Sequence, residues 1–353
     1  MGKNNNHLKR RDFLKEFGLG AIGMVAFGQG VFPEVRGHRN LGAFPKISKQ
    51  LYKKVIEPSR VSLVKGNDRR QIVYQSLKMI EDEVLASIGN KKIVVKPNIV
   101  LSNRPLAVTH IDAVRAVLDF LTPHYKKQII IGESGVQNTW EGFKNYGYFE
   151  LEKEYRAKIV DFNRDSYQYW YVFGEGMRPL PVRIINTFLD PDIYIVSVAR
   201  MKTHDTVLVT LSLKNAIMAS PLNDYKKNDK GLLHAFTKSV SDICHFNIFH
   251  LAQKVYPDLA IIDGFEAMEG NGPGDGTPFD SRVVLASRDA LAADTIAARV
   301  MGFDPRRILY LTAMTEAGMG QGEVEKINVI GTPLDQCLYK FKPHEKMAEI
   351  YKL

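Results

Sequence analysis

The chain has 353 residues, 45% of them hydrophobic and 25% charged, which is the composition of an ordinary globular protein. Its formal net charge of +9 is spread thinly, without a basic stripe interleaved with aromatics, and this favours a small anionic ligand or a membrane surface over nucleic acid. No run reaches the ~18 to 20 apolar residues of a bilayer-spanning helix, so no stable transmembrane span is expected unless an export signal stays uncleaved.

Cys244 and Cys337 are the only two cysteines. Two cysteines are too few for an iron–sulfur cluster or a cysteine-based zinc site. They either form one disulfide in an oxidising compartment or lie apart as buried thiols.

The first 30 residues have the layout of a twin-arginine export signal. Lys9, Arg10, Arg11 and a Phe13-Leu14-Lys15 run give the motif, and a short glycine-rich apolar segment follows to about Gly30. The alternative is a basic amphipathic helix at a soluble N-terminus. The sequence therefore predicts a signal over residues 1–30, the Tat translocase as export partner, and a periplasmic or extracellular protein that is exported already folded.

After a polar linker over residues 31–60, apolar runs of strand length alternate with segments of helical period. Strands are predicted at Val61–Val64, Lys92–Lys96, Gln128–Ile131, Lys158–Phe162, Ile193–Val198, Leu259–Ile262 and Arg282–Ala286, and helices at Gln71–Ile88, Ile111–Leu121 and Asp289–Met301. This alternation predicts an α/β domain over residues 61–332, in one body or two lobes, with a mainly parallel sheet and helices on both faces.

Two segments depart from this alternation. Tyr167–Phe188 is aromatic, alternating and rich in Gly and Pro, which predicts a β-hairpin-like insertion. Residues 333–353 are rich in lysine and are expected to form a peripheral tail.

A first polar cluster follows the Lys92–Lys96 strand. Lys96 and Asn98 flank Pro97, and Arg104 and His110 lie in the next loop. Ligands of parallel α/β sheets gather at the carboxyl ends of strands, and the guanidinium fork of Arg104 suits an anion. Lys96, Asn98 and Arg104 are therefore candidate substrate-binding residues, whereas Thr109 is expected to cap the next helix.

A second cluster lies beyond the Ile193–Val198 strand. Lys202 and His204 lead into a run in which, on a period of two, Thr210, Ser212 and Lys214 share one face, with Asn215 next in the chain. A lysine on a segment built for burial is either paired or has a depressed pKa. This predicts Lys202 and Asn215 as substrate-binding, and His204 and Lys214 as catalytic. A surface-facing edge strand is the alternative.

His234 lies in the charged loop Lys226–Phe236. Together with His110 and His204 it supplies either acid–base groups or metal ligands. Their spacing matches no standard zinc pattern, so the metal ion stays an option.

A glycine-rich stretch follows the Leu259–Ile262 strand. Asp263 and Glu269 are candidate metal ligands there, and Gly270 and Gly272 are candidates to hold a cofactor through their backbone amides. Further along, Asp294 lies among alanines, which indicates either a buried partner or a role in the site.

In this order the clusters resemble the family of domain of unknown function 362, over residues of about 60–330. The resemblance rests on Lys96-Pro97-Asn98, Gly132-Glu133-Ser134, Lys202-Thr203-His204, Thr210–Asn215, His234, Asp263-Gly264, Glu269–Pro273, Asp289, Asp294 and Met301-Gly302. Many members also carry a ferredoxin-type cysteine cluster, which this chain lacks, so electron transfer is not implied.

The chain also shows a distant similarity to lactate racemase and its relatives, which hold a nickel–pincer nucleotide on a lysine. Their His, Lys and second His come in the order of His204, Lys214 and His234, and Arg104 lies in a weakened form of their substrate motif. The similarity implies that Lys214 carries the cofactor, that His234 ligates nickel, and that His204 and His110 move protons. The interval from Lys214 to His234 is longer than in those proteins, and the aspartate of their substrate motif is not evident at the matching position.

Two hypotheses follow from these residues. In the first, the chain is an enzyme that acts on a small anionic metabolite by Lys and His acid–base chemistry or by cofactor chemistry. In the second, the same residues form a non-catalytic site that captures a periplasmic solute or cofactor.

Overall fold

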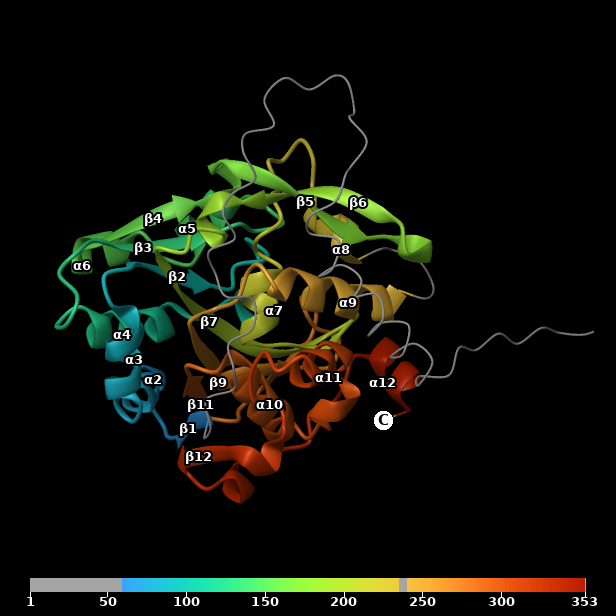
Figure 1. The fold of residues 1–353 in the computed structure, drawn as a ribbon. Coiled ribbons are helices and arrows are strands. Elements are labelled where there is room, and N and C mark those ends of the chain that lie inside the picture. The colour runs from blue at the N-terminus through green and yellow to red at the C-terminus, as the bar shows by residue number, and fades with distance from the viewer. Residues whose placement is uncertain (1–58, 235–239, 353) are drawn as a thin grey trace, which may run out of the picture. The chain divides into compact units, whose positions relative to one another are not determined.

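A computed structural model describes residues 59–352 apart from 235–239, so the predicted signal and nearly all of the predicted linker lie outside the described residues. The strands are β1 (Ser59–Lys65), β2 (Lys92–Pro97), β3 (Ile129–Glu133), β4 (Ala157–Asp161), β5 (Tyr167–Phe173), β6 (Pro179–Ile185), β7 (Ile193–His204), β8 (Leu208–Thr210), β9 (Leu259–Glu269), β10 (Thr277–Phe279), β11 (Val283–Ser287) and β12 (Ile327–Gly331). The α-helices are α2 (Arg69–Lys78), α3 (Glu81–Ile88), α4 (Ile111–Leu121), α5 (Thr139–Asn145), α6 (Glu150–Glu154), α7 (Ser212–Ile217), α8 (Lys230–His234), α9 (Val240–Ala252), α10 (Ala290–Val300), α11 (Leu309–Glu316) and α12 (Glu345–Tyr351). Figure 1 shows their arrangement.

One large sheet organises these elements, in the order β12-β1-β11-β9-β7-β2-β3-β4. Neighbouring strands run parallel along this path except at β11, which is antiparallel to both β1 and β9. The short strands β8 and β10 add antiparallel pairs to β7 and β9. The predicted α/β fold with a mainly parallel sheet is confirmed.

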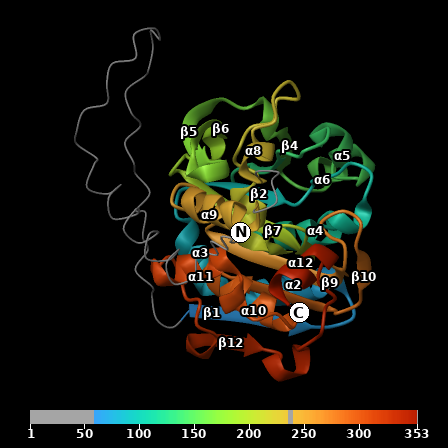
Figure 2. The same cartoon turned by 90° about the vertical axis from the view of Figure 1, so that its right-hand side faces the viewer.

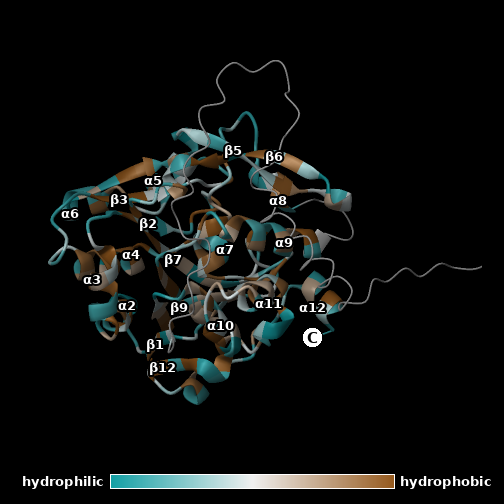
Figure 3. Ribbon diagram, in the orientation of Figure 1, coloured by the Kyte–Doolittle hydropathy of each residue, from teal (hydrophilic) through white to brown (hydrophobic). Residues whose placement is uncertain are grey.

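Helices cover both faces of the sheet, as the two views in Figures 1 and 2 show. On one face α2 and α4 pack together, and their apolar residues share a core with Val95, Val196 and Ile261 of the sheet. The other face is covered by α7 and α10. Brown apolar residues in Figure 3 lie along the strands between these two helical layers. Burial on both faces explains why the central strands read as continuous apolar runs.

The aromatic segment forms the predicted hairpin, a separate two-stranded sheet of β5 and β6. Alternation along β5 leaves Tyr167, Tyr169 and Tyr171 exposed on one side. On the other side Trp170 stacks on His250 of α9 and donates a 3.2 Å hydrogen bond from Nε1 to the His250 Nε2. The hairpin is thereby docked on α9.

The single helix predicted over Gln71–Ile88 is wrong, because the chain forms two helices there. Ile80 leaves helical geometry, with φ −122° and ψ 21°, although its side chain is buried in step with the apolar period. Glu81, Asp82 and Glu83 then open α3, where carboxylates favour the positive end of a helix dipole. The acidic triplet was the signal for a new helix start.

The sheet changes winding direction between β2 and β7. From β2 the chain proceeds to β3 and β4 on one side, and it returns through β7 on the other side of β2. Ligands of open α/β sheets bind outside the carboxyl ends of the strands at such a switch point. The carboxyl ends of β2, β3 and β7 carry Lys96, Glu133 and His204.

Cys244 and Cys337 are both buried and unpaired. No helix within the part of the chain that the structure describes is long and apolar enough to cross a membrane.

Candidate active site

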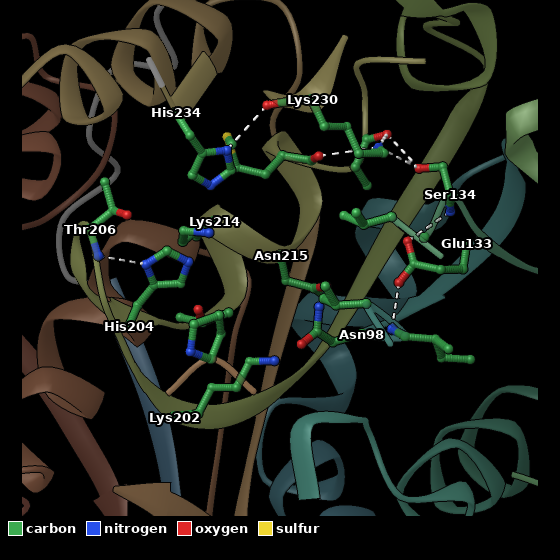
Figure 4. A pocket seen from close by; sticks show the side chains of 18 of the residues that line it. Asn98, Glu133, Ser134, Lys202, His204, Thr206, Lys214, Asn215, Lys230 and His234 are labelled. Atoms are coloured by element: carbon green, nitrogen blue, oxygen red, sulfur yellow. Dashed lines mark hydrogen bonds between the residues drawn. The ribbon is translucent and has the colours of Figure 1, made fainter. Parts of the chain in front are cut away.

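A cavity of about 280 Å³ opens at this switch point. Four lysines and two histidines line it, opposed by two carboxylates; these residues are Lys96, Lys202, Lys214, Lys230, His204, His234, Glu133 and Asp205. They come from strands β2, β3 and β7, from helices α7 and α8 and from the turn after β7. The cavity therefore has an excess of basic groups, and Figure 4 shows how they converge.

Lys96 is fully paired. Its Nζ donates to Glu133 Oε2 at 2.8 Å, to Asn215 Oδ1 at 2.6 Å and to the Pro97 carbonyl at 2.8 Å. The backbone N–H groups of Ile99 and Ser134 donate to the same Glu133 carboxylate. Burial lowers the pKa of Lys96, while the Glu133 carboxylate acts in the opposite direction. Because all three ammonium donors are used, Lys96 holds the cavity wall together.

Lys230 is paired in a similar way. It opens α8, and its Nζ donates to Ser134 Oγ at 3.1 Å and to the carbonyls of Ala219 and Met218 at 2.8 and 3.3 Å. Burial lowers the pKa of Lys230 to about 7. Two of these acceptors tie α8 to the segment after α7, and Ser134 ties it to the end of β3.

Lys202 keeps part of its donor capacity. Among the described residues its Nζ donates only to the Ala107 carbonyl, at 2.7 Å. Lys202 and Thr210 stand directly opposite each other in the β7–β8 pair, so their side chains lie on the same face of that hairpin. The Thr210 Oγ1 is buried and finds no partner within residues 59–234 and 240–352. Burial, followed by the charge of Lys214, lowers the pKa of Lys202 well below its usual value.

Lys214 lies on helix α7 and not on the predicted strand. The strand β8 ends at Thr210 and α7 begins at Ser212, so the period-two interpretation of this run is wrong. The reason is Asp294 of α10, whose buried carboxylate accepts the backbone N–H groups of Ser212 and Leu213 at 2.8 and 3.1 Å and caps the helix. A residue 82 positions away thus decides the local structure.

The Lys214 amine is buried and, among the described residues, donates no hydrogen bond. Burial lowers the pKa of Lys214. In Figure 4 its amine points into the space between the rings of His204 and His234. Among the described residues, Lys214 is therefore the lysine of the cavity without a hydrogen-bond acceptor.

His204 and His234 stack beside Lys214, with ring centroids 6.0 Å apart and planes inclined by 18°. Nδ1 of His204 accepts the Thr206 backbone N–H at 3.0 Å and also lies 3.0 Å from the Asp205 carboxylate. Nδ1 of His234 lies 3.1 Å from the Lys230 carbonyl. A carbonyl only accepts, so Nδ1 of His234 carries its proton, and Nε2 offers a lone pair. The Thr206 N–H favours a neutral His204 with its proton on Nε2, whereas the Asp205 carboxylate at the same Nδ1 favours a proton on Nδ1.

Burial and the Lys214 charge lower the pKa of both histidines, that of His204 far below its usual value and that of His234 to about 4. Near neutral pH the cavity thus offers two neutral imidazoles beside one amine. Asp205 is placed to stabilise His204 if that ring takes up a second proton.

Several predicted site residues lie away from this cavity. His110 caps α4, its Nδ1 accepting the Asp112 N–H, and takes the place expected for Thr109. The hydroxyl of Thr109 instead bridges the Asn98 N–H and the Val198 carbonyl. The Arg104 side chain is 54% exposed and pairs with Asp275.

Asp263 lies inside β9 because the strand does not end there. The pairing of β9 with β7 is interrupted between Asp263 and Met268, and the strand then continues to Glu269. The Asp263 carboxylate faces Arg69 at 3.2 Å, and Glu269 accepts the Lys342 N–H. The Asp-Gly pair therefore marks an irregularity within the strand.

Gly270 and Gly272 pack against the protein itself. Gly270 has a φ of +74°, which suits glycine, and its carbonyl accepts from Thr203 Oγ1. A Cβ on Gly272 would lie 2.2 Å from the Thr203 carbonyl oxygen. Both glycines allow a close approach to β7. Of the predicted residues, the structure brings together Lys96, Asn98, Lys202, His204, Lys214, Asn215 and His234.

Sequence reasoning missed Glu133, Ser134, Asp205 and Lys230 as lining residues. Lys230 precedes His234 by four residues, which places both on one face of a helix, and this spacing was the signal available for it. In the described part of the chain, no group of three or more His, Cys, Asp or Glu side chains is arranged to hold a metal ion.

Comparison with known proteins identifies a family and a relative that the chain resembles. A family model described as a domain of unknown function (DUF362) matches residues 93–299. A thylakoid-associated protein of Synechocystis is 25% identical over 280 residues, which cover 76% of this chain and 82% of that protein. A crystal structure of a Thermotoga maritima protein aligns with a TM-score of 0.35 and 13% identity, over 56% of this chain and about half (51%) of that one.

Proposed function

The chain belongs to the family of domain of unknown function 362, and from that premise we propose that it is an enzyme that transfers protons on a small anionic metabolite. The observation that carries this proposal is the placement of Lys214. A buried amine without a hydrogen-bond acceptor among the described residues stands beside two stacked histidines in a cavity lined by four lysines. Pairs of titratable groups whose environments fix opposite proton states are the usual basis of acid–base catalysis.

The four lysines favour an anion as the ligand. Lys96 and Lys230 use their donors within the protein. Among the described residues a protonated Lys202 keeps two N–H donors, and it lies opposite Thr210, whose hydroxyl has no partner there. A carboxylate or phosphate group bound there supplies acceptors for both. The volume of about 280 Å³ is at the lower end of the range for ligand pockets, ~300–1,000 Å³, and limits the ligand to a small metabolite.

The two histidines then act in different ways. Nε2 of His234 has the lone pair that removes a proton, and Nε2–H of His204 donates to a carbonyl or hydroxyl oxygen of the ligand. Asp205 balances a positive charge that develops on His204.

A nickel–pincer nucleotide on Lys214, the cofactor of the distantly similar racemases, fits these residues only in part. Lys214 and His234 share the cavity, but His110 and Arg104, which would complete the racemase set, lie outside it in a helix cap and in an exposed ion pair. The residues that the structure describes therefore do not bring that set together, and no step is derived through nickel.

Deuterium exchange tests the proposal. Lactate, malate, pyruvate, 2-oxoglutarate and glycerol phosphate are first screened for binding by thermal shift, and each binder is incubated with the protein in D₂O and followed by proton NMR. We expect loss of a C–H signal next to the oxygenated carbon with the wild type, and at least a 100-fold slower loss with His234→Gln. His124→Gln, on an exposed histidine, is the matched control. Binding without exchange in the wild type would instead establish a solute- or cofactor-binding protein.

We also propose that the chain is exported through the twin-arginine route. The Arg10-Arg11 motif supports this route, and the thylakoid-associated relative supports a place of action at or beyond a membrane. Replacing both arginines with lysine should leave the protein in the cytoplasmic fraction of its host. Unchanged distribution of this variant would refute the route.

A further inference from the structure

We propose that Lys214 forms an imine with the carbonyl group of an oxo acid, with the acid group of that ligand held by Lys202 and Thr210. This inference rests on the proposed function and narrows its substrate class from small anions to anions that carry an aldehyde or ketone.

The first argument is the difference among the four lysines. Lys96 and Lys230 each have three acceptors, and Lys202 has the Ala107 carbonyl. Within the described residues Lys214 has none, although it is 6% exposed. A lysine kept to bind an anion by charge is normally held in its charged form by a carboxylate or carbonyl. Burial lowers the pKa of Lys214, and the neutral amine is the nucleophilic form.

The second argument is that the residues proposed to hold the anionic end of the ligand are distinct from the lysine proposed to attack its carbonyl carbon. Lys202, Thr210 and His204 lie on one face of the β7–β8 pair, because Lys202 and Thr210 are opposite and His204 follows two residues later. Lys214 projects from α7 into the same cavity. A ligand whose anionic end lies at Lys202 and Thr210 therefore presents its adjacent carbon to Lys214 and its carbonyl oxygen to His204.

The chemistry is balanced without a further reactant. The Lys214 nitrogen forms a bond to the carbonyl carbon as the carbonyl π electrons move to oxygen, which accepts a hydrogen bond from His204 Nε2–H. His234 Nε2 takes one proton from the nitrogen and delivers it to that oxygen, giving a carbinolamine. His234 Nε2 then moves the remaining proton of the nitrogen to the hydroxyl oxygen as the C–O bond breaks. The products are a neutral C=N bond and one water molecule.

The experiment is reductive trapping with pyruvate and 2-oxoglutarate as probes. The intact protein is incubated with each probe and sodium cyanoborohydride, and the adduct is located by peptide mass spectrometry. We expect one adduct per chain, on Lys214, and its loss in Lys214→Arg. Lactate, which lacks the carbonyl, should give no adduct. Lys153→Arg, at an exposed lysine, should label like the wild type, and a circular dichroism spectrum shows whether Lys214→Arg is folded.

The outcomes separate the two proposals. Deuterium exchange into a bound probe without any trapped adduct would overturn the imine and leave the acid–base function intact. Saturable binding with neither exchange nor adduct would overturn both. Adducts spread over several lysines, or adducts that form equally well on protein unfolded in urea, would also overturn the assignment to Lys214.

Discussion

The rings of His204 and His234 stack 6.0 Å apart, yet their Nδ1 atoms have opposite kinds of backbone partner. Nδ1 of His204 faces a backbone N–H, whereas Nδ1 of His234 faces a backbone carbonyl. These contacts favour different tautomers of the two rings, the Asp205 carboxylate beside Nδ1 of His204 acts against the first, and burial lowers the pKa of both rings.

Nitrogen NMR of histidine-labelled protein should reveal these tautomers directly. We expect protonated Nε2 in His204 and protonated Nδ1 in His234 at pH 7. Because burial and Lys214 lower the pKa of His234, its ring should titrate near pH 4, below the ~6.5 of a free histidine. His234→Gln assigns the signal. A His234 titration near pH 6.5 would contradict the buried arrangement.

Replacing Lys214 with methionine should leave the free energy of unfolding unchanged or raise it. The substitution removes a buried amine that has no acceptor among the described residues and fills the space with an apolar chain. Lys96→Met should lower stability by about 3–5 kcal/mol, because it leaves the Glu133 carboxylate buried without its cation. Urea unfolding measures both. Equal losses in the two variants would show that Lys214 has a structural partner.

Much of the fold follows from local pattern, and the site follows less well. Apolar β-branched runs marked β2, β7 and β11 correctly, since each is buried on both faces. Helix α7 could not be predicted from its own sequence because Asp294, which caps it, lies in a distant part of the chain. Asp263 looked like a strand end because an Asp-Gly pair also suits an irregularity inside a strand. Alternation and turn residues are local, whereas these contacts are set by tertiary structure.

Arg183 of β6 should control the mobility of the wall that carries Lys230 and His234. Its guanidinium donates to Asp229 at 2.9 Å and pairs with Asp224, and it is buried. Arg183→Met should therefore raise amide exchange across residues 222–234 by about 100-fold or more, equivalent to ~3 kcal/mol. Arg282→Met, in an exposed pair with Asp280, serves as the control. Unchanged amide exchange in Arg183→Met would show that the contacts of Arg183 do not restrain residues 222–234.

The aromatic hairpin should loosen from α9 in acid. Burial lowers the pKa of His250 to about 4, and its neutral Nε2 accepts the Trp170 N–H. A group with a lowered pKa in the folded state stabilises above its unfolded pKa of ~6.5, and this contribution is lost as pH falls toward 4. In a Trp140→Phe background, Trp170 fluorescence should change with a midpoint near pH 4. His250→Asn should abolish that transition, and persistence of the transition would assign it to another group.

Because Asp294 caps α7, the residues of this helix are synthesised well before the side chain that completes its N-terminus. Ser212 and Leu213 leave the ribosome some 80 residues before their acceptor, so the helix that aims Lys214 into the cavity stays uncapped until Asp294 has also emerged. A nascent chain that stops between residues 213 and 294 therefore carries Lys214 but lacks the carboxylate that caps its helix.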